Sequence, residues 1–390
     1  MSNLLPIDQR RGIASAIKHA LTFARSMTDI VIQEGRPIMA KTARGTIPLH
    51  TMFQGTVQEF MVTKEHIVCY LAGYVEGEER ESDPQKYWDD YLKPQLEKRV
   101  PVNLRLDGKG SYSVRYTLFV QQRGQLELVM RITPKTITPL HQLGLPTNLM
   151  HTLSESNAGF IAITGPTGSG KTATALSILD FHNTSHGGHI VTIEDPVEVV
   201  VQPRNCIVTQ REVGYDVRSF AEGMREALRM SPDLMLTGEI RDGETAEQAI
   251  QGGESGSLML ATTHGRSIAG TCRKILSYTG QNAPVMRSVL AGCMVAIVRQ
   301  ALVPSAKKDS YFMVADVLFN AGKVPSLIEA GDWLGLEHAI REEKLGNAEY
   351  ISMNTRLSDL VKKGEVDKAD ALRETSDVSG LNRKLSQTTR

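Results

Sequence analysis

Eight consecutive residues carry the clearest chemical signal in this sequence. They fit the pattern G-x-x-x-x-G-K-[ST] and are, in order, Gly165, Pro166, Thr167, Gly168, Ser169, Gly170, Lys171 and Thr172. In such a turn the glycines let successive backbone N–H groups face phosphate oxygens, and the helix that follows adds its dipole. Lys171 would reach the β- and γ-phosphates, while the Thr172 hydroxyl would bind Mg²⁺. The pattern predicts a site for ATP and Mg²⁺; the alternative is a chance glycine-rich turn.

Hydrolysis needs a carboxylate that orients water at the γ-phosphate, and two acidic residues follow apolar segments. These are Glu194, after HIVTI, and Glu239, after LMLTG. Gly238 stands where many nucleotide hydrolases carry a metal-binding Asp. Mg²⁺ coordination is therefore expected on Thr172 and on a water held by Glu194, with Glu239 as the general base. Either acid could instead cap the following helix.

A histidine, His264, ends a third apolar segment, LMLATT. A histidine at such a position can sense the γ-phosphate and relay its loss to the rest of the chain. The alternative is a satisfied core histidine.

The elements that position these residues alternate between strand and helix. Four short apolar segments are expected to be strands: 159–164, 189–193, 234–237 and 258–263. Helical faces lie between them, which predicts a parallel α/β sheet covered on both sides. The earlier part, with a helix over 13–25 and alternating segments at 30–33, 112–120 and 126–132, favours a small mixed α/β domain.

Prolines at 134, 139 and 146 exclude one regular helix or a central strand between these two parts. The sequence therefore predicts an N-terminal domain over 1–132, a linker over 133–147 and a second domain over 148–390. The end of the chain has a helical pattern, with C-terminal helices expected from about residue 333.

Composition excludes several classes of protein. The 44 basic and 44 acidic residues balance, which argues against coating nucleic acid by bulk charge. The four cysteines show no C-x-x-C pair, so neither a disulfide framework nor a zinc site is expected. The longest apolar run, 289–298, is too short to cross a bilayer and predicts a buried core segment. Without a signal-peptide pattern, we expect a cytoplasmic protein whose membrane contact is peripheral.

Four motifs in this order resemble the secretion ATPases, the hexameric motors of type II and type IV secretion, conjugation and type IV pili. They are IEDPVE (193–198), QREVG (210–214), GEIRD (238–242) and GESGSLMLATTHG (253–265), similar to the Asp box, a connecting motif, the Walker B motif and the His box. The resemblance extends to Thr28-Asp29-Ile30 near the start, HQLGLP in the linker and AIRE at 339–342, and it is strongest to the PilT and DotB branch.

This resemblance implies a PAS-like α+β domain followed by a RecA-like P-loop NTPase domain, helices at the C-terminus and a homohexameric ring. It implies that Glu239 is the catalytic glutamate and that Glu194 lies near metal and water. Arginines of the N-terminal domain close over nucleotide in this family, which points to Arg115 and Arg131, and after them Arg123. One departure is that the His box carries Ser257 where the family usually has a first histidine.

The function implied is ATP hydrolysis that drives macromolecular transport at the bacterial inner membrane, with a membrane platform or companion ATPase as partner. A type IVB secretion or conjugation motor is expected first, on the 76–100 insertion, Ser257 and ATTHGRS. A PilT-like retraction motor is the runner-up, favoured by AIRE. A DNA-translocating motor is disfavoured because aromatic residues make up only 5% and no cluster of five Lys/Arg exists. A nucleotide switch without turnover is the remaining alternative, motivated by Gly238 and Ser257.

Overall fold

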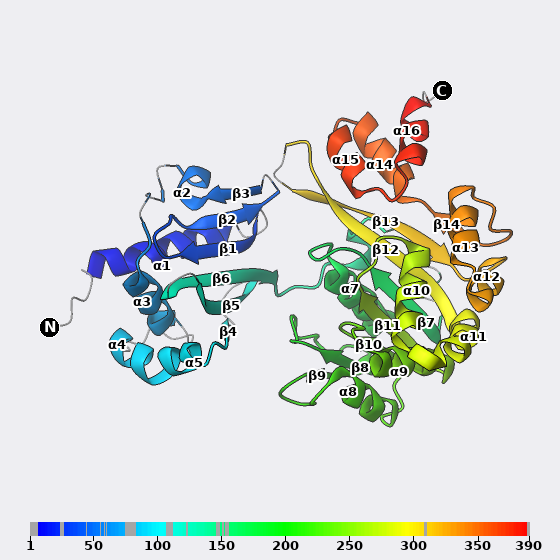
Figure 1. Cartoon of the computed structure of the whole chain (residues 1–390), viewed down its shortest axis with the longest axis horizontal. Helices are drawn as coiled ribbons and strands as arrows, with labels where there is room; N and C mark the ends of the chain where they lie inside the picture. The colour runs from blue at the N-terminus through cyan, green and yellow to red at the C-terminus, as the bar shows by residue number, and fades with distance from the viewer. Residues whose placement is uncertain are drawn as a thin grey trace. The chain divides into compact units, whose positions relative to one another are not determined.

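The chain forms two compact units, each described by itself. The first comprises Met1–Thr136 and Lys307–Ser310, and the second Ile137–Ala306 and Tyr311–Arg390. Figure 1 shows the elements of both units, coloured along the chain. The computed structural model describes residues 7–23, 27–43, 45–54, 56–57, 59, 61–74, 83–106, 112–121, 124–145, 149, 152, 156–307 and 310–387.

An antiparallel sheet forms the centre of the first unit, with the strand order β3-β2-β1-β6-β5-β4. Its strands are β1 (Met27–Gln33), β2 (Met39–Thr42), β3 (Gly45–Pro48), β4 (Val102–Leu106), β5 (Tyr112–Gln121) and β6 (Gln125–Pro134). Burial alternates along β6, where Leu126, Leu128 and Met130 are buried while Arg131 is exposed. This alternation is the pattern of a sheet with one face on a core and one face in water.

Helices supply the other side of this core. They are α1 (Ile7–Thr22), α2 (Leu49–Met52), α3 (Lys64–Tyr74), α4 (Pro84–Tyr87), the π-helical η2 (Trp88–Leu92) and α5 (Lys93–Glu97). Ile13 and Ile17 of α1 and Ile67 and Leu71 of α3 join the same buried cluster as the apolar residues of the sheet. The unit is therefore a small α+β domain.

A mostly parallel sheet forms the centre of the second unit, in the order β14-β13-β12-β7-β11-β10-β8-β9. Among the described strands of this sheet, the pairs β12–β13 and β13–β14 are antiparallel and the other pairs are parallel. The strands are β7 (Gly159–Thr164), β8 (Gly188–Glu194), β9 (Cys206–Glu212), β10 (Leu234–Thr237), β11 (Leu258–Thr263), β12 (Met294–Pro304), β13 (Tyr311–Phe319) and β14 (Tyr350–Ile351).

Helices cover both faces of this sheet (Figure 1). Phe160 and Ala162 of β7 enter a core shared with α8 to α11, whereas Ile161 and Ile163 enter a second core shared with α7. Alternate side chains of one strand thus need helices on both sides, as a buried parallel strand requires. The helices are α7 (Lys171–Ser185), α8 (Phe220–Leu228), α9 (Gly243–Glu254), α10 (Ile268–Tyr278), α11 (Ala283–Cys293), α12 (Val324–Ala330) and α13 (Trp333–Arg341), with short 3₁₀ turns η4 (Leu140–Gln142) and η5 (Gly280–Asn282).

The last helices of the described part of the chain pack on β12 and β13. They are α14 (Met353–Lys362), α15 (Lys368–Glu374) and α16 (Val378–Ser386). Leu357, Ala371 and Leu381, one from each helix, share a small core with Ala301 and Val303 of β12. The C-terminal helices are therefore anchored to the same strand that lies beside β7.

The apolar run at 289–298 is not a single element. It is divided between the end of α11 and the start of β12, at Cys293 and Met294. The run is buried on both sides of the junction at Leu290 and Ile297, so the expectation of a core segment is met by two elements instead of one. Among the described residues, no helix is both long and apolar enough to cross a membrane.

The region proposed as a linker, 133–147, contains both strand and turn. Its first two residues complete β6, and η4 follows further along. Leu140 and Leu145 are buried in the core of the second unit beneath α7. The proposed limits 1–132, 133–147 and 148–390 stay a prediction, and residues 146–148 lie outside the described part of the chain.

Candidate active site

The glycine-rich turn links β7 to α7 at the carboxyl end of the strand. Gly170, the N-cap of α7, has a φ of 84°, a left-handed conformation that favours glycine. Gly165 approaches its neighbours closely, since a Cβ there would lie 2.3 Å from the carbonyl oxygen of Gln300. The first N–H groups of α7 have no partner within the helix, so together with the loop amides they can bind phosphate oxygens.

Lys171 begins α7 and turns back over the loop. Its Nζ donates to the carbonyl oxygens of Gly165 at 3.1 Å and Pro166 at 3.0 Å, and lies 3.3 Å from Nδ1 of His264. Burial lowers the pKa of the Lys171 ammonium, while the nearby Glu239 acts in the opposite direction. Phosphate oxygens would replace two neutral carbonyls with charged acceptors, which favours the protonated lysine.

Glu239 follows β10 and reaches the same place. Its Oε1 lies 3.2 Å from Nε2 of His264, and its Oε2 accepts from Nε and Nη2 of Arg241 at 2.8 and 2.7 Å. Gly238, the atypical residue before it, passes close to β8: a Cβ there would lie 3.3 Å from the carbonyl oxygen of Ile193. A side chain at 238 would therefore crowd the end of β8.

His264 joins the loop to the acid. Its Nδ1 lies 3.2 Å from the carbonyl oxygen of Gly165 and 3.3 Å from the Lys171 ammonium, and its Nε2 faces Glu239. A neutral ring that donates from Nε2 can accept at Nδ1 from Lys171. The structure thus brings together Lys171, Glu239 and His264, which lie far apart in the sequence.

Arg241 is a member of this cluster that the sequence analysis did not single out. Beyond its two contacts with Glu239, its Nη1 lies 3.6 Å from Oδ2 of Asp195. The hydrogen bond to Glu239 raises the pKa of the Arg241 guanidinium, so this group stays charged. Its position in GEIRD, two residues after the acid, was the available signal, but spacing alone does not show that the side chain folds back.

Glu194 ends β8 and is almost completely buried, with 3% of its surface exposed. Its Oε1 accepts from Thr192 Oγ1 at 2.7 Å and from Gln210 Nε2 at 3.0 Å. Burial raises the pKa of the Glu194 carboxyl, although both hydrogen bonds oppose that shift. Gln210, from β9, is a second supporting residue that sequence analysis missed, despite its place in QREVG.

The residues present fit Mg²⁺ only as a partner of bound nucleotide. No cluster of three or more His, Cys, Asp or Glu able to hold a metal occurs among the residues that the structure describes. Mg²⁺ in nucleotide enzymes keeps several waters and takes few protein ligands, the rest coming from phosphates. The Thr172 hydroxyl at the start of α7 and the Glu194 carboxylate are suitable donors of this kind.

The predicted arginines lie in the first unit. Arg115 and Arg131 are cross-strand neighbours in β5 and β6, and Arg131 Nε donates to Asp29 Oδ1 of β1 at 3.1 Å. Asp29 is 5% exposed, so a buried acid offsets part of the positive charge. Arg123 lies outside the described residues.

Ser257 lies at the opposite end of β11 from His264. It precedes the first residue of the strand, and its hydroxyl donates to the carbonyl oxygen of Pro232 at 2.7 Å. The side chain is buried and satisfied by this backbone contact. The hydroxyl thus holds the start of β11 in place.

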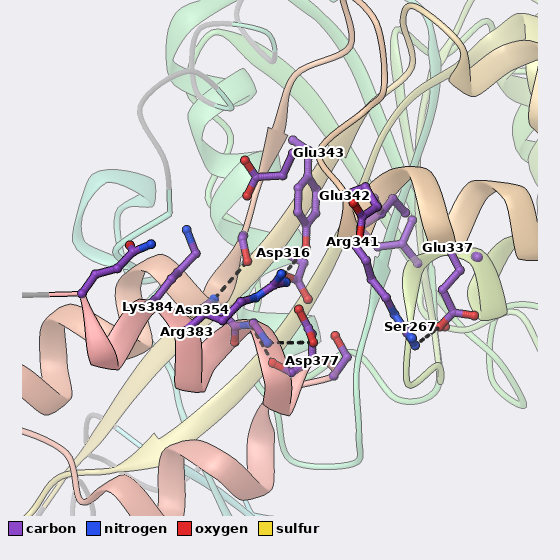
Figure 2. Close-up of a pocket in the computed structure, with 18 residues that line it drawn as sticks. Ser267, Asp316, Glu337, Arg341, Glu342, Glu343, Asn354, Asp377, Arg383 and Lys384 are labelled. Atoms are coloured by element: carbon purple, nitrogen blue, oxygen red, sulfur yellow. Dashed lines mark hydrogen bonds and ion pairs between the residues drawn. The ribbon is translucent and has the colours of Figure 1, made fainter.

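A cavity of about 370 Å³ in the second unit is formed by other elements. Figure 2 shows Glu337 and Arg341 of α13 on one side of it and Arg383 and Lys384 of α16 on the other. Asp316 also lines it. We call this cavity the C-terminal pocket; neither the phosphate loop nor Glu239 is among its lining residues.

A G-x-x-x-x-G-K-[ST] turn between a parallel strand and a helix is the pattern of the P-loop nucleotide-binding proteins. Here that turn links β7 to α7, and Glu239 and His264 lie beside it. The family model for type II/IV secretion system proteins matches residues 89–375. The chain belongs to this family of secretion and pilus ATPases, which includes PilT, and is itself an ATPase.

Individual relatives agree with this assignment. The type IV pilus retraction ATPase PilT of Pseudomonas aeruginosa is 30% identical over 286 residues, covering 73% of this chain and 81% of that protein. The uncharacterised protein YggR of Escherichia coli is 37% identical over 229 residues, covering 58% of this chain and 69% of YggR.

Solved structures agree with the fold. The pilus retraction motor PilT with bound ADP superposes with a TM-score of 0.73 at 28% identity, over 95% of this chain and 99% of that one. The ATPase DotB of Yersinia pseudotuberculosis gives 0.76 at 21% identity, over 96% and 95%. The expected RecA-like domain, preceded by a smaller PAS-like α+β domain, is confirmed.

Proposed function

We propose that this ATPase is a Mg²⁺-dependent motor that works as a homohexamer and powers type IVB secretion or conjugative transfer. The observation that supports hydrolysis best is the cluster at the phosphate loop. There the Lys171 ammonium, the His264 ring and the Glu239 carboxylate follow one another at 3.3 and 3.2 Å. The imidazole ring of His264 thus lies between the Lys171 ammonium, which would bind phosphate, and the Glu239 carboxylate, the candidate general base.

The roles follow from the chemistry of each group. The loop amides and Lys171 bind the β- and γ-phosphates. Glu239 accepts a proton from water as the water oxygen attacks the γ-phosphorus, and ADP leaves with the electrons of the broken P–O bond. His264 contacts Oε1 of Glu239, so the attacking water has to approach a lone pair of the Glu239 carboxylate that His264 does not occupy. When bound, Mg²⁺ neutralises phosphate charge; Thr172 would hold it directly and Glu194 through a water.

Two arginines complete the proposed chemistry. Arg115 and Arg131 are guanidinium groups of the kind that spread the charge developing on the γ-phosphate. Arg131 is held by Asp29, while Arg115 lies beside it in the register of β5 and β6. We propose that both arginines contact the bound nucleotide, because the first unit resembles the N-terminal domain of the family.

The setting of the motor is proposed from the family. A ring of six subunits would work on the cytoplasmic side of the bacterial inner membrane, in peripheral contact with it. Its partner would be a membrane platform or a companion ATPase, and no specific contact with nucleic acid is expected.

A retraction motor of a type IV pilus is the second candidate, because sequence identity to PilT (28–30%) exceeds that to DotB (21%). Pilin genes beside this gene would favour retraction, and relaxase or effector-secretion genes would favour transfer.

Substitution of the two central residues tests the proposed hydrolysis. Glu239→Gln removes the base while keeping the shape of the side chain, so we expect ATP turnover to fall by about 100-fold or more with binding retained. Lys171→Ala should weaken ATP binding itself, because it removes a charge-assisted contact. Phosphate release and ATP titration on both variants measure these effects. An undiminished rate in Glu239→Gln would exclude this residue as the base.

The ring is tested by sizing. Analytical ultracentrifugation of the full chain with and without ATP and Mg²⁺ should show a species of six subunits when nucleotide is present. A strictly monomeric protein under both conditions would contradict the proposed assembly.

A further inference from the structure

β12 passes directly beside the point where β7 ends and the phosphate loop begins. The two strands are parallel, and Arg299 of β12 pairs with Thr164, the last residue of β7. The next residue of β12, Gln300, is completely buried. It lies more than a hundred residues after the loop in the sequence, and no motif of the sequence analysis contains it.

Gln300 contacts the loop at both of its ends. Its side-chain Nε2 donates to the carbonyl oxygen of Ser169 at 2.6 Å. At the other end, its own carbonyl oxygen lies 2.3 Å from where a Cβ on Gly165 would be. A Cβ on Gly170 would lie 3.4 Å from Nε2. One residue of a neighbouring strand therefore lies against the first and the last turns of the loop.

The contact with Ser169 fixes the direction of one backbone amide. A trans peptide is planar, and its C=O and N–H groups point in opposite directions. When Gln300 holds the Ser169 carbonyl towards β12, the N–H of Gly170 in the same peptide points away from β12. A free peptide at this glycine could rotate, since Gly170 is not restricted by a side chain.

We propose that Gln300 is a positioning residue of the phosphate loop, which orients the Ser169–Gly170 peptide for nucleotide phosphates. This inference rests on the proposed role of the loop in binding ATP. Gln300 does not contact nucleotide; it acts through the loop backbone. The buried carboxamide is the part that matters, because a side chain without a donor would leave the Ser169 carbonyl unpaired in the interior.

The test compares variants that lose the donor with a matched control. Gln300→Leu and Gln300→Met keep approximately the volume of the side chain and remove its N–H groups. In the control, Asn320→Leu, a carboxamide that donates to the carbonyl oxygen of Ala291 at 2.8 Å is lost elsewhere in the same unit. ATP and ADP affinities, KM and kcat are measured on the full chain with Mg²⁺, beside Lys171→Ala.

We expect both Gln300 variants to bind ATP and ADP about tenfold more weakly, with KM rising in parallel and kcat within about threefold of the parent. Asn320→Leu should keep its affinity within twofold. Parent-like affinity in either folded Gln300 variant, while Lys171→Ala has lost binding, would overturn the inference. A Lys171→Ala protein that binds like the parent would instead overturn the proposed nucleotide site. If one Gln300 variant fails to fold, the other decides.

Discussion

Two arginine–carboxylate pairs of the second unit have similar geometry and opposite surroundings. In the candidate active site, Arg241 lies 2.7 Å from Glu239, with side chains 56% and 19% exposed. Between β12 and β13, Arg299 lies 3.0 Å from Asp316, with side chains only 7% and 4% exposed. The shorter pair is the more exposed one. Because water screens the first pair and not the second, burial rather than distance decides how much each contributes.

The buried pair is the centre of a hydrogen-bond network. Asp316 Oδ1 accepts from the Tyr350 hydroxyl and from the Met353 N–H, each at 2.8 Å. Arg299 Nη2 donates to the carbonyl oxygen of Glu374 at 3.0 Å. Burial, with Asp316 beside it, raises the pKa of Tyr350 far above its ordinary value. These contacts hold α14 and α15 against the sheet. Arg299, which makes one of them, is followed in β12 by Gln300, the residue proposed to position the phosphate loop.

The largest effect is expected from breaking the buried pair. Arg299→Ala leaves Asp316 as a buried charge without its cation, which typically costs about 3–5 kcal/mol of unfolding free energy. Urea unfolding can be followed in a Trp88→Phe background, where Trp333 of α13 is the single tryptophan and reports on the second unit.

A double variant controls for the loss of the arginine side chain. Arg299→Met with Asp316→Asn removes both charges and keeps a side-chain oxygen that can accept from Tyr350 and Met353, so most of the lost stability should return. If Arg299→Ala alone lowers the unfolding free energy by less than about 1 kcal/mol, the unpaired charge of Asp316 is not a major cost. Burial would then not distinguish the Arg299–Asp316 pair from the Arg241–Glu239 pair.

A smaller effect, on rate rather than on stability, is expected at the exposed pair. Arg241→Gln leaves Glu239 held by His264 alone, so we expect kcat to fall about tenfold, or ~1.4 kcal/mol in activation free energy, with KM for ATP nearly unchanged. Arg241→Lys keeps the charge and should recover part of the rate. Steady-state kinetics at saturating ATP and Mg²⁺ measure both.

The smallest effect is expected at a surface pair that serves as the control for Arg241. Arg225 Nη1 lies 3.0 Å from Glu244 Oε1, and both side chains are more than half exposed. Arg225→Gln should change the unfolding free energy by less than about 0.5 kcal/mol and leave kcat unaltered. A fall in kcat equal to that of Arg241→Gln would mean that charge anywhere on this surface, and not the contact with Glu239, controls the rate.

Local patterns predicted much of the second unit. The strands β7, β10 and β11 have the expected bounds, because each is a short apolar segment that ends at polar or glycine residues. Lys171, Glu239 and His264 were also found from the sequence and do lie together, since parallel strands end at one edge of a sheet. The run at 289–298 was predicted to be a buried core segment, which is confirmed. The sequence did not show that it divides between α11 and β12, because an unbroken apolar run has no period to separate helix from strand.

Supporting residues could not be predicted in the same way. Gln300 and Gln210 are polar residues in strands, and spacing shows neither what they face nor which backbone group they hold. Arg299 and Asp316 become partners only through the antiparallel register of β12 and β13. In the first unit, the pairing of Arg131 with Asp29 likewise depends on the register of β1 and β6.

The amino-acid order by itself determined the phosphate loop, since the glycines, the lysine and the strand-to-helix switch that create it lie within fifteen residues. It also determined the alternation that gives a parallel sheet. Only the tertiary structure decided which distant side chains fix that loop and its acid, and which charges are buried. Hydrogen bonds and desolvation depend on positions in space, and sheet order and register bring residues more than a hundred apart into contact.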